Sequence, residues 1–225
     1  IQLGAILAVV VLYFPKLWPF CSPKNGWIKK DTWILWFKVI VAALPAAIIG
    51  LPFDDLLDKL FYNYQTVAVT LILYGVLFIV VENYNKKRRP RIKSLESLPW
   101  STALLIGVFQ ILALIPGTSR SGATIIGALT LGVSRTAAAD FTFFLAIPAM
   151  AGASLVKLRH FGFDFTGIEL GLLLLGCVVS FVVSILAIKF LLKYIQNHDF
   201  KAFGWYRIVL GALVLVYFIG KTLLA

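Results

Sequence analysis

Charged residues, cysteines and histidines are all scarce in this sequence. Only 14% of its 225 residues are charged, whereas 60% are hydrophobic, and the mean hydropathy is +0.93. Ordinary soluble domains are less apolar, so the composition excludes that class. It predicts instead an all-α, polytopic bundle of membrane helices, each of which needs about 20 apolar residues to cross the hydrocarbon. We expect one transmembrane domain, residues 1–225, in a multi-pass membrane protein.

The sequence also has few residues that bind metal ions. Its two cysteines, Cys21 and Cys177, are far apart and lack metal-ligand spacing. The two histidines, His160 and His198, fall in different predicted loops and share no cluster with carboxylates. A metal site built from these residues alone is therefore not expected in this chain.

The start of the sequence does not read as a signal peptide. No positively charged leader or small-residue cleavage site accompanies the first apolar run, 1–14. This run starts abruptly and is short for a membrane span. We therefore expect that an N-terminal portion of the protein precedes Ile1.

Basic residues outnumber acidic ones by 21 to 10, but their placement argues against nucleic-acid binding. They gather in short stretches between apolar runs, above all at 86–93, as in the cytoplasmic loops of membrane proteins. Membrane lipids, and not nucleic acids, are therefore the expected partners.

Hydropathy predicts six spans and one hairpin. A short amphipathic helix at the membrane interface is predicted for 52–64, where apolar residues recur at helical spacing and acidic residues lie on the opposite face. Residues 100–133 are predicted to form a re-entrant hairpin, because the run 124–133 is too short to cross. Such a hairpin is allowed only where protein covers it or where it lines a cavity. The six predicted spans are 1–14, 33–51, 65–81, 137–156, 168–192 and 206–223.

The stretch 114–124 is the one place where polar residues interrupt a long apolar background. Arg120 lies there with apolar runs on both sides, and an arginine at membrane depth usually faces a cavity or a charged partner. Its planar, permanently charged group suits two phosphate oxygens. Gly117 and Gly122 allow backbone amides to approach a ligand, and the following helix start attracts anions. The side chains that add hydroxyl groups are Thr118, Ser119, Ser121 and Thr124.

This inventory predicts a phosphate-binding hairpin tip. Ser121 and Thr124 are three residues apart, so both are expected to point at the ligand of Arg120. The alternative is a plain helix break whose hydroxyl residues cap the helix and whose arginine reaches the headgroups. Gln110 is either a buried amide that bonds a neighbouring helix or a group on the ligand side.

The remaining polar residues are expected to have structural roles. Asp140 is predicted to cap its helix or to pair with Arg135, and Glu82 to lie at the interface beside the basic loop. His198 is predicted to be an ordinary loop residue.

Residues 116–124 read Pro-Gly-Thr-Ser-Arg-Ser-Gly-Ala-Thr, which resembles the Pro-Gly-x-Ser-Arg-Ser-x-x-Thr motif of the bacterial undecaprenyl-diphosphatase family, linked to bacitracin resistance. The resemblance implies an enzyme of the bacterial inner membrane that hydrolyses undecaprenyl diphosphate to undecaprenyl phosphate and inorganic phosphate. This reaction recycles the lipid carrier of peptidoglycan synthesis. The other segments that resemble the family in order and spacing are 1–10, 132–135, 143–148 and 205–207.

The resemblance also implies an architecture and a site. The family is similar in fold to inverted-repeat transporters, with two re-entrant hairpins and an active site open to the outer face, and it depends on a divalent cation, Mg²⁺ or Ca²⁺. On that pattern Arg120 holds the isoprenyl diphosphate as the catalytic cation, and Ser119, Ser121 and Thr124 line the same pocket. Gln110 stands where the second repeat carries its counterpart of a glutamate in the first.

The sequence departs from the family at one point. The family's glutamate-rich helix and its Pro-Val-Ser-Ser-Thr-Gly-His motif would precede Ile1, together with the metal ligands and the candidate nucleophile. We therefore expect the chain as printed to be inactive alone. The main alternative is a lipid-phosphate transporter or flippase of inverted-repeat architecture, since these proteins bind anions at similar helix breaks. A structural membrane subunit is a further alternative, and a homodimer is a possibility that the sequence does not decide.

Overall fold

The computed structural model describes residues 1–20, 29–86, 88–161 and 166–224, and the regular structure in these ranges is helical. Five helices are long and apolar enough to cross a membrane: α3, α4, α7, α8 and α9. The prediction of an all-α polytopic membrane bundle is thus confirmed. The elements are α1 (Gln2–Leu12), α2 (Phe14–Leu17), α3 (Lys30–Phe61), α4 (Tyr64–Asn85), α5 (Trp100–Ile111), the 3-10 helix η2 (Leu112–Leu114), α6 (Arg120–Thr130), α7 (Arg135–Phe161), α8 (Gly167–Asn197) and α9 (Lys201–Leu224).

Five of the six predicted spans lie within these long helices. The remaining one, 1–14, forms only the 11-residue α1 and the short α2. Cys21 lies outside the described residues, and Cys177 is a free thiol in α8.

The amphipathic helix predicted for 52–64 is not a separate element, and this prediction was wrong. α3 continues without interruption to Phe61, with Pro45 and Pro52 inside it. Each proline removes one backbone donor, and membrane helices tolerate this loss where neighbouring segments pack closely. Gly50 marks such a place, because a β-carbon there would lie 3.0 Å from the side chain of Leu114.

Small residues allow pairs of helices to approach closely, as is common in membrane bundles. α4 packs along α9, and a β-carbon on Gly75 would lie 2.6 Å from the carbonyl oxygen of Gly204. α5 packs along α3 in the same way, with Gly107 against the backbone of Ala42. These two close pairs fix α9 and α5 on either side of the centre of the molecule.

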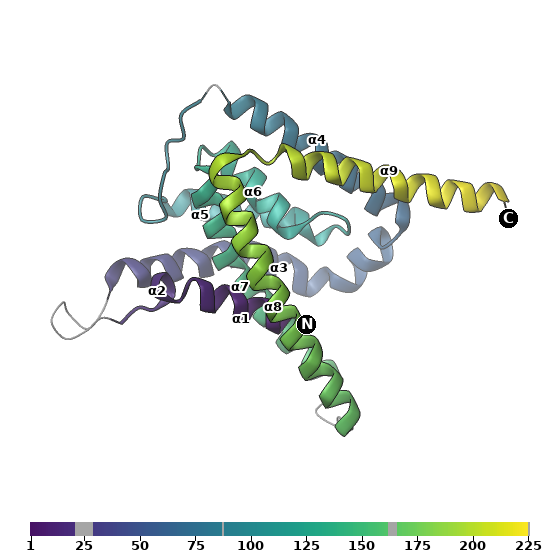
Figure 1. Ribbon diagram of the computed structural model, residues 1–225, viewed down its shortest axis with the longest axis horizontal. Helices are drawn as coiled ribbons and strands as arrows, with labels where there is room; N and C mark the ends of the chain where they lie inside the picture. The colour runs from purple at the N-terminus through teal and green to yellow at the C-terminus, as the bar shows by residue number, and fades with distance from the viewer. Residues whose placement is uncertain (21–28, 87, 162–165, 225) are drawn as a thin grey trace.

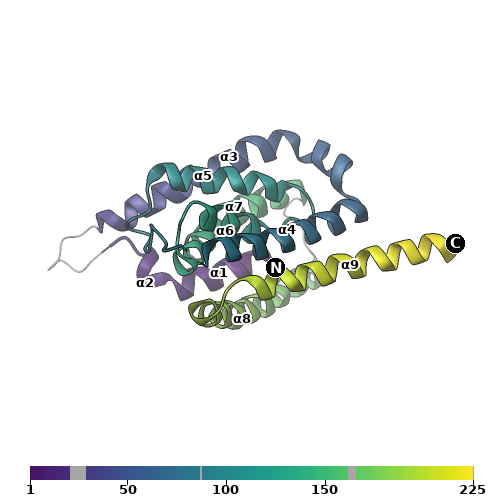
Figure 2. The ribbon, with the colours of Figure 1, turned by 90° about the horizontal axis from the view of Figure 1, so that it is seen from above.

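The centre is formed by α6 and α7. Figure 2 shows them between α3 and α5 on one side and α8 on the other. α7 supplies completely buried side chains, namely Phe141, Phe144 and Leu145. α8 and α9 extend beyond the other helices (Figure 1), and many of their large apolar side chains are exposed, as expected of a surface that contacts lipid.

The hairpin of α5 and α6 returns to the side from which it starts. The amides of Arg91 and Ile92, before α5, both donate to the carbonyl of Gly132, after α6, at 2.9 and 3.2 Å. Its tip lies beside the first third of α4, where the hydroxyl of Thr70 donates to the carbonyl of Pro116 at 2.9 Å. The arms contain 12 and 11 residues, too few to cross a membrane. This is the geometry expected of a re-entrant hairpin; the inverted repeat stays a prediction.

Candidate functional site

The tip of the hairpin is a backbone turn held from outside by two helices. Gly117 has a φ of +85°, and a β-carbon on it would meet the Thr70 hydroxyl and lie 2.7 Å from the carbonyl oxygen of Val67. Only glycine fits this conformation and this space. Its carbonyl accepts a hydrogen bond from Nη2 of Arg207, in α9, at 2.7 Å. The carbonyls of Pro116 and Gly117 are therefore both held by side chains from α4 and α9.

The start of α6 adjoins this turn, and its first two amides have no hydrogen-bond acceptor among the described residues. Ser119 caps the helix, and its hydroxyl accepts from the amide of Gly122 at 3.2 Å. The hydroxyls of Ser119 and Ser121 lie 3.0 Å apart. The amides of Arg120 and Ser121 are in the first turn, where no carbonyl of the helix can accept from them. They carry the positive end of the helix dipole. The helix start predicted at the tip is therefore present, and anion binding there stays a prediction.

Arg120 is the one arginine of this tip sequence. It is half-buried, and no described residue forms a hydrogen bond or an ion pair with its guanidinium group. A permanent charge in this position favours an anionic ligand, because burial without a counter-ion costs free energy. The structure thus places the predicted catalytic cation beside the free amides of the same helix end.

A second arginine lies at the tip. Arg207 is only 9% exposed, and besides its bond to Gly117 it lies 5.8 Å from the centre of the Tyr74 ring. Its Nε atom is buried without a partner among the described residues, and so is Oγ1 of Thr118, which lies near the phenol of Tyr74 but outside hydrogen-bond geometry. Buried polar atoms normally have partners, so unpaired ones indicate a place where a ligand or water binds.

Sequence reasoning missed Arg207, although a signal was present. This arginine opens an apolar run, and it belongs to a segment that resembles the undecaprenyl-diphosphatase family. The rule that selected Arg120, a charge inside an apolar helix, applies to it equally.

Thr124, one of the predicted site residues, is more buried than expected. Thr124 is 1% exposed, and its hydroxyl donates to the carbonyl of Arg120 and shares a hydrogen bond with Thr142 of α7 at 3.0 Å. It therefore anchors α6 to α7, whereas Ser121 is exposed. That the two hydroxyls face one ligand stays a prediction. A threonine in a helix commonly bonds the carbonyl four residues earlier, and this sets its orientation.

Gln110 is 4% exposed in α5, and its carbonyl oxygen Oε1 has no partner among the described residues. The predicted bond to a neighbouring helix is thus absent at this atom. Its role on the ligand side stays a prediction.

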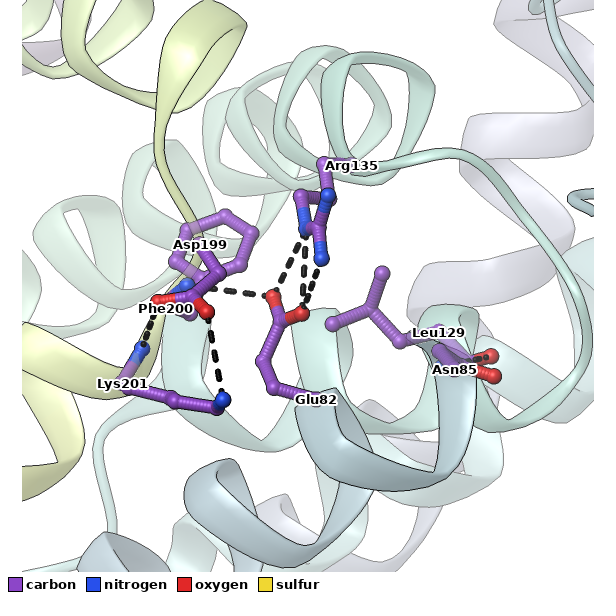
Figure 3. Close-up of polar contacts among 7 residues, drawn as sticks. All are labelled: Glu82, Asn85, Leu129, Arg135, Asp199, Phe200 and Lys201. Atoms are coloured by element: carbon purple, nitrogen blue, oxygen red, sulfur yellow. Dashed lines mark hydrogen bonds and ion pairs between the residues drawn. The ribbon is translucent and has the colours of Figure 1, made fainter. Parts of the chain in front are cut away.

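A second polar cluster lies at the far end of α6 (Figure 3). The carboxylate of Glu82 accepts from Nε of Arg135 at 2.9 and 3.0 Å, and from the amide of Phe200 at 3.0 Å. Glu82 lies near the end of α4 beside the basic loop 88–91, where it was expected, but it is 1% exposed, and its burial against Arg135 was not predicted. Its partners come 53 and 118 residues later in the chain, beyond the reach of local sequence reasoning.

Asp140 neither caps its helix nor pairs with Arg135, the two alternatives that were predicted. It accepts from the hydroxyl of Tyr13 at 2.7 Å and from Nζ of Lys16 at 2.9 Å. Residues five apart in a helix point roughly 140° away from each other, which separates Asp140 from Arg135.

His198 lies just after α8 and stacks on Tyr194, as expected of a residue between helices.

Comparison of the sequence with known proteins shows the family to which the chain belongs. Residues 1–213 match the family described as bacitracin resistance protein BacA. The chain belongs to the BacA family. The undecaprenyl-diphosphatase of Desulfitobacterium hafniense is 60% identical over 225 residues, which cover 100% of this chain and 81% of that protein.

Two further relatives of this BacA family member have a similar sequence identity to it. The undecaprenyl-diphosphatase of Acetivibrio thermocellus is 63% identical over 219 residues, 97% of this chain and 80% of that protein. One from Enterococcus faecalis is 62% identical over 218 residues, 96% of this chain and 79% of that protein. The resemblance found in the motif at 116–124 thus extends over nearly the whole chain.

Proposed function

We propose that this multi-pass membrane protein hydrolyses undecaprenyl diphosphate to undecaprenyl phosphate and inorganic phosphate in the bacterial plasma membrane. The observation that carries this proposal is the unpaired guanidinium group of Arg120 beside the free amides of α6, in a chain whose relatives are named undecaprenyl-diphosphatases. The reaction supplies the lipid carrier for another round of peptidoglycan synthesis.

The tip offers what a diphosphate requires. Arg120 presents two parallel donors to phosphate oxygens, and the amides of Arg120 and Ser121 add donors from the helix end. The hydroxyls of Ser119 and Ser121 lie beside them. Phosphoryl transfer depends mainly on positioning and on stabilising negative charge, and fixed donors at membrane depth are well suited to both. The isoprenyl chain occupies the apolar surface between helices.

Arg207 contributes indirectly by holding the Gly117 carbonyl. This bond, together with that from Thr70 to Pro116, keeps the two carbonyl oxygens of the turn engaged. Carbonyl oxygens that pointed at a diphosphate would repel it. We therefore assign Arg207 and Thr70 to positioning of the tip.

A divalent cation, Mg²⁺ or Ca²⁺, is also proposed. The described residues contain no group of three or more His, Cys, Asp or Glu that could hold a metal ion, and the tip offers hydroxyls and carbonyls where Mg²⁺ prefers carboxylates. These residues therefore do not fit a cation held by this part of the chain alone. We expect a chelator to lower phosphate release and added Mg²⁺ or Ca²⁺ to restore it; unchanged turnover in the chelator would remove the cation from the proposal.

The decisive experiment measures phosphate release from undecaprenyl diphosphate by the purified full-length protein in nanodiscs. Arg120→Ala should lower kcat/KM by about 100-fold or more, because it removes the main fixed charge at the tip. The matched control is Arg159→Ala, which removes an exposed arginine near the end of α7.

Two outcomes would contradict the proposal. Full turnover in the folded Arg120→Ala protein would exclude Arg120 from the active site. A wild-type protein that moves lipid phosphates across a vesicle bilayer but releases no phosphate would instead support the transporter alternative.

A further inference from the structure

A second concave site lies at the opposite end of α6 from the hairpin tip. It is a cavity of about 220 Å³ between the end of α4, the loop 88–91 and the turn 129–135 that joins α6 to α7. The tip lies beside Thr70 of α4 and the cavity beside Asn85. Fifteen helical residues separate these positions by roughly 22 Å, so the cavity is distinct from the proposed active site.

The cavity is strongly basic. Its lining contains four arginines, Arg88, Arg89, Arg91 and Arg135, against a single acid, Glu82. That acid is already neutralised, because it accepts from Arg135 and from the amide of Phe200 (Figure 3). The formal charge of the lining is therefore +3, which favours an anionic ligand.

The four arginines are not equally engaged. The guanidinium group of Arg88 lies 3.9 Å from the centre of the Tyr84 ring, and Arg135 is bound to Glu82. Arg89 and Arg91 are exposed, and their side chains have no hydrogen-bond or ion-pair partner among the described residues. These two side chains are thus available for a ligand, with the other two arginines close by.

The backbone around the cavity is held in place. The amide of Arg91 donates to the carbonyl of Gly132 at 2.9 Å, and Nδ2 of Asn85 donates to the carbonyl of Leu129 at 3.0 Å. The pairing of Ile92 with Val133 continues this connection. If the loop were basic only because cytoplasmic loops of membrane proteins are rich in Lys and Arg, it would need none of these hydrogen bonds. The connection lowers the conformational entropy that binding would cost.

The position along the membrane identifies the source of the anion. The cavity lies where two apolar spans meet the aqueous boundary, since α4 ends at Asn85 and α7 begins at Arg135. Lipid headgroups occupy this depth, and basic pockets between helices there bind phosphate headgroups. Arginine is also the side chain best shaped to bind a phosphate by two donors.

We propose that this cavity binds the phosphate headgroup of an anionic membrane lipid, with Arg89 and Arg91 as its principal ligands. The site is independent of the hydrolysis proposed above. It ties the start of the hairpin, the end of the hairpin and the end of α4 to one lipid molecule.

The test measures lipid retention by native mass spectrometry of the full-length protein. Phosphatidylglycerol is the anionic probe, phosphatidylcholine the zwitterionic one, and inorganic phosphate the soluble one. Arg89→Gln/Arg91→Gln should retain phosphatidylglycerol about tenfold less than the wild type, while phosphate release from undecaprenyl diphosphate stays unchanged. The matched control, Lys29→Gln/Lys30→Gln, removes two positive charges at the start of α3 and should retain as much lipid as the wild type.

Three results would overturn the proposal. Equal loss in the lysine control would mean general attraction to basic loops, and equal retention in the arginine variant would mean a different site. Displacement of the lipid by inorganic phosphate at micromolar concentration would make the soluble anion the ligand. If the glutamine variant does not accumulate, Arg89→Lys/Arg91→Lys keeps the charge and should still lose about threefold, because lysine lacks the two-donor geometry.

Discussion

Arg120, the first residue of α6, and Arg135, the first residue of α7, lie in opposite environments. Arg120 is half-buried and has no partner among the described residues, whereas Arg135 donates from both Nε and Nη2 to the buried carboxylate of Glu82. Both are arginines next to short apolar runs, so charge and hydropathy alone do not distinguish them. The comparison teaches that the counter-ion decides the role: a paired arginine holds helices together, and an unpaired one is left for a ligand.

The largest expected effect on stability comes from breaking the paired arginine. Arg135→Met should lower the free energy of unfolding in detergent by about 3 kcal/mol, because Glu82 would stay buried without its partner. This is the lower end of the range for buried pairs, since the Arg135 side chain is 38% exposed. Thermal unfolding followed by circular dichroism measures the loss. Arg120→Ala should unfold like the wild type in the same assay.

The double variant Glu82→Leu/Arg135→Met is the control for this pair. It removes both charges, so it should be more stable than Arg135→Met alone, although the amide of Phe200 loses its acceptor. A single variant as stable as the wild type would show that the pair is not structural. If Arg135→Met were stable but had no turnover, Arg135 would be needed for activity, as is proposed for Arg120, and the two arginines would not differ in role.

A smaller effect is expected from the arginine that supports the tip without being part of it. Arg207→Lys keeps the charge but loses the planar group that reaches the Gly117 carbonyl. We expect KM for undecaprenyl diphosphate to rise roughly tenfold with a smaller fall in kcat, because a slightly misplaced tip binds the diphosphate less well. The same exchange at an exposed position, Arg159→Lys, should change neither constant. A variant that lost kcat alone would place Arg207 on the reacting phosphate.

Hydropathy predicted the fold to a large extent because membrane helices depend on local composition. The long helices and the hairpin break at 114–120 follow from apolar run lengths and from the cluster of polar residues. The continuous α3 was missed because prolines end helices in water more readily than in a packed membrane bundle.

The site was predictable only in part, because its contacts are not local. Arg120 and the cap Ser119 were found from one short motif. The bond from Arg207 to Gly117 joins residues 90 apart, and that from Tyr13 to Asp140 joins residues 127 apart. No periodicity encodes such pairs; only the rule that buried charges need partners indicates that a partner exists.

The smallest effects separate two hydroxyl residues that the sequence had placed on one face. Thr124→Val keeps the shape of the side chain and removes the hydrogen bond to Thr142, so it should cost about 1 kcal/mol of stability and leave KM unchanged. Ser121→Ala removes an exposed hydroxyl beside Ser119, so stability should stay the same while KM rises about twofold. Unfolding and phosphate-release assays on the two variants check both expectations. If Thr124→Val raised KM and left stability intact, its hydroxyl would face the diphosphate after all, and the original expectation for Thr124 would be restored.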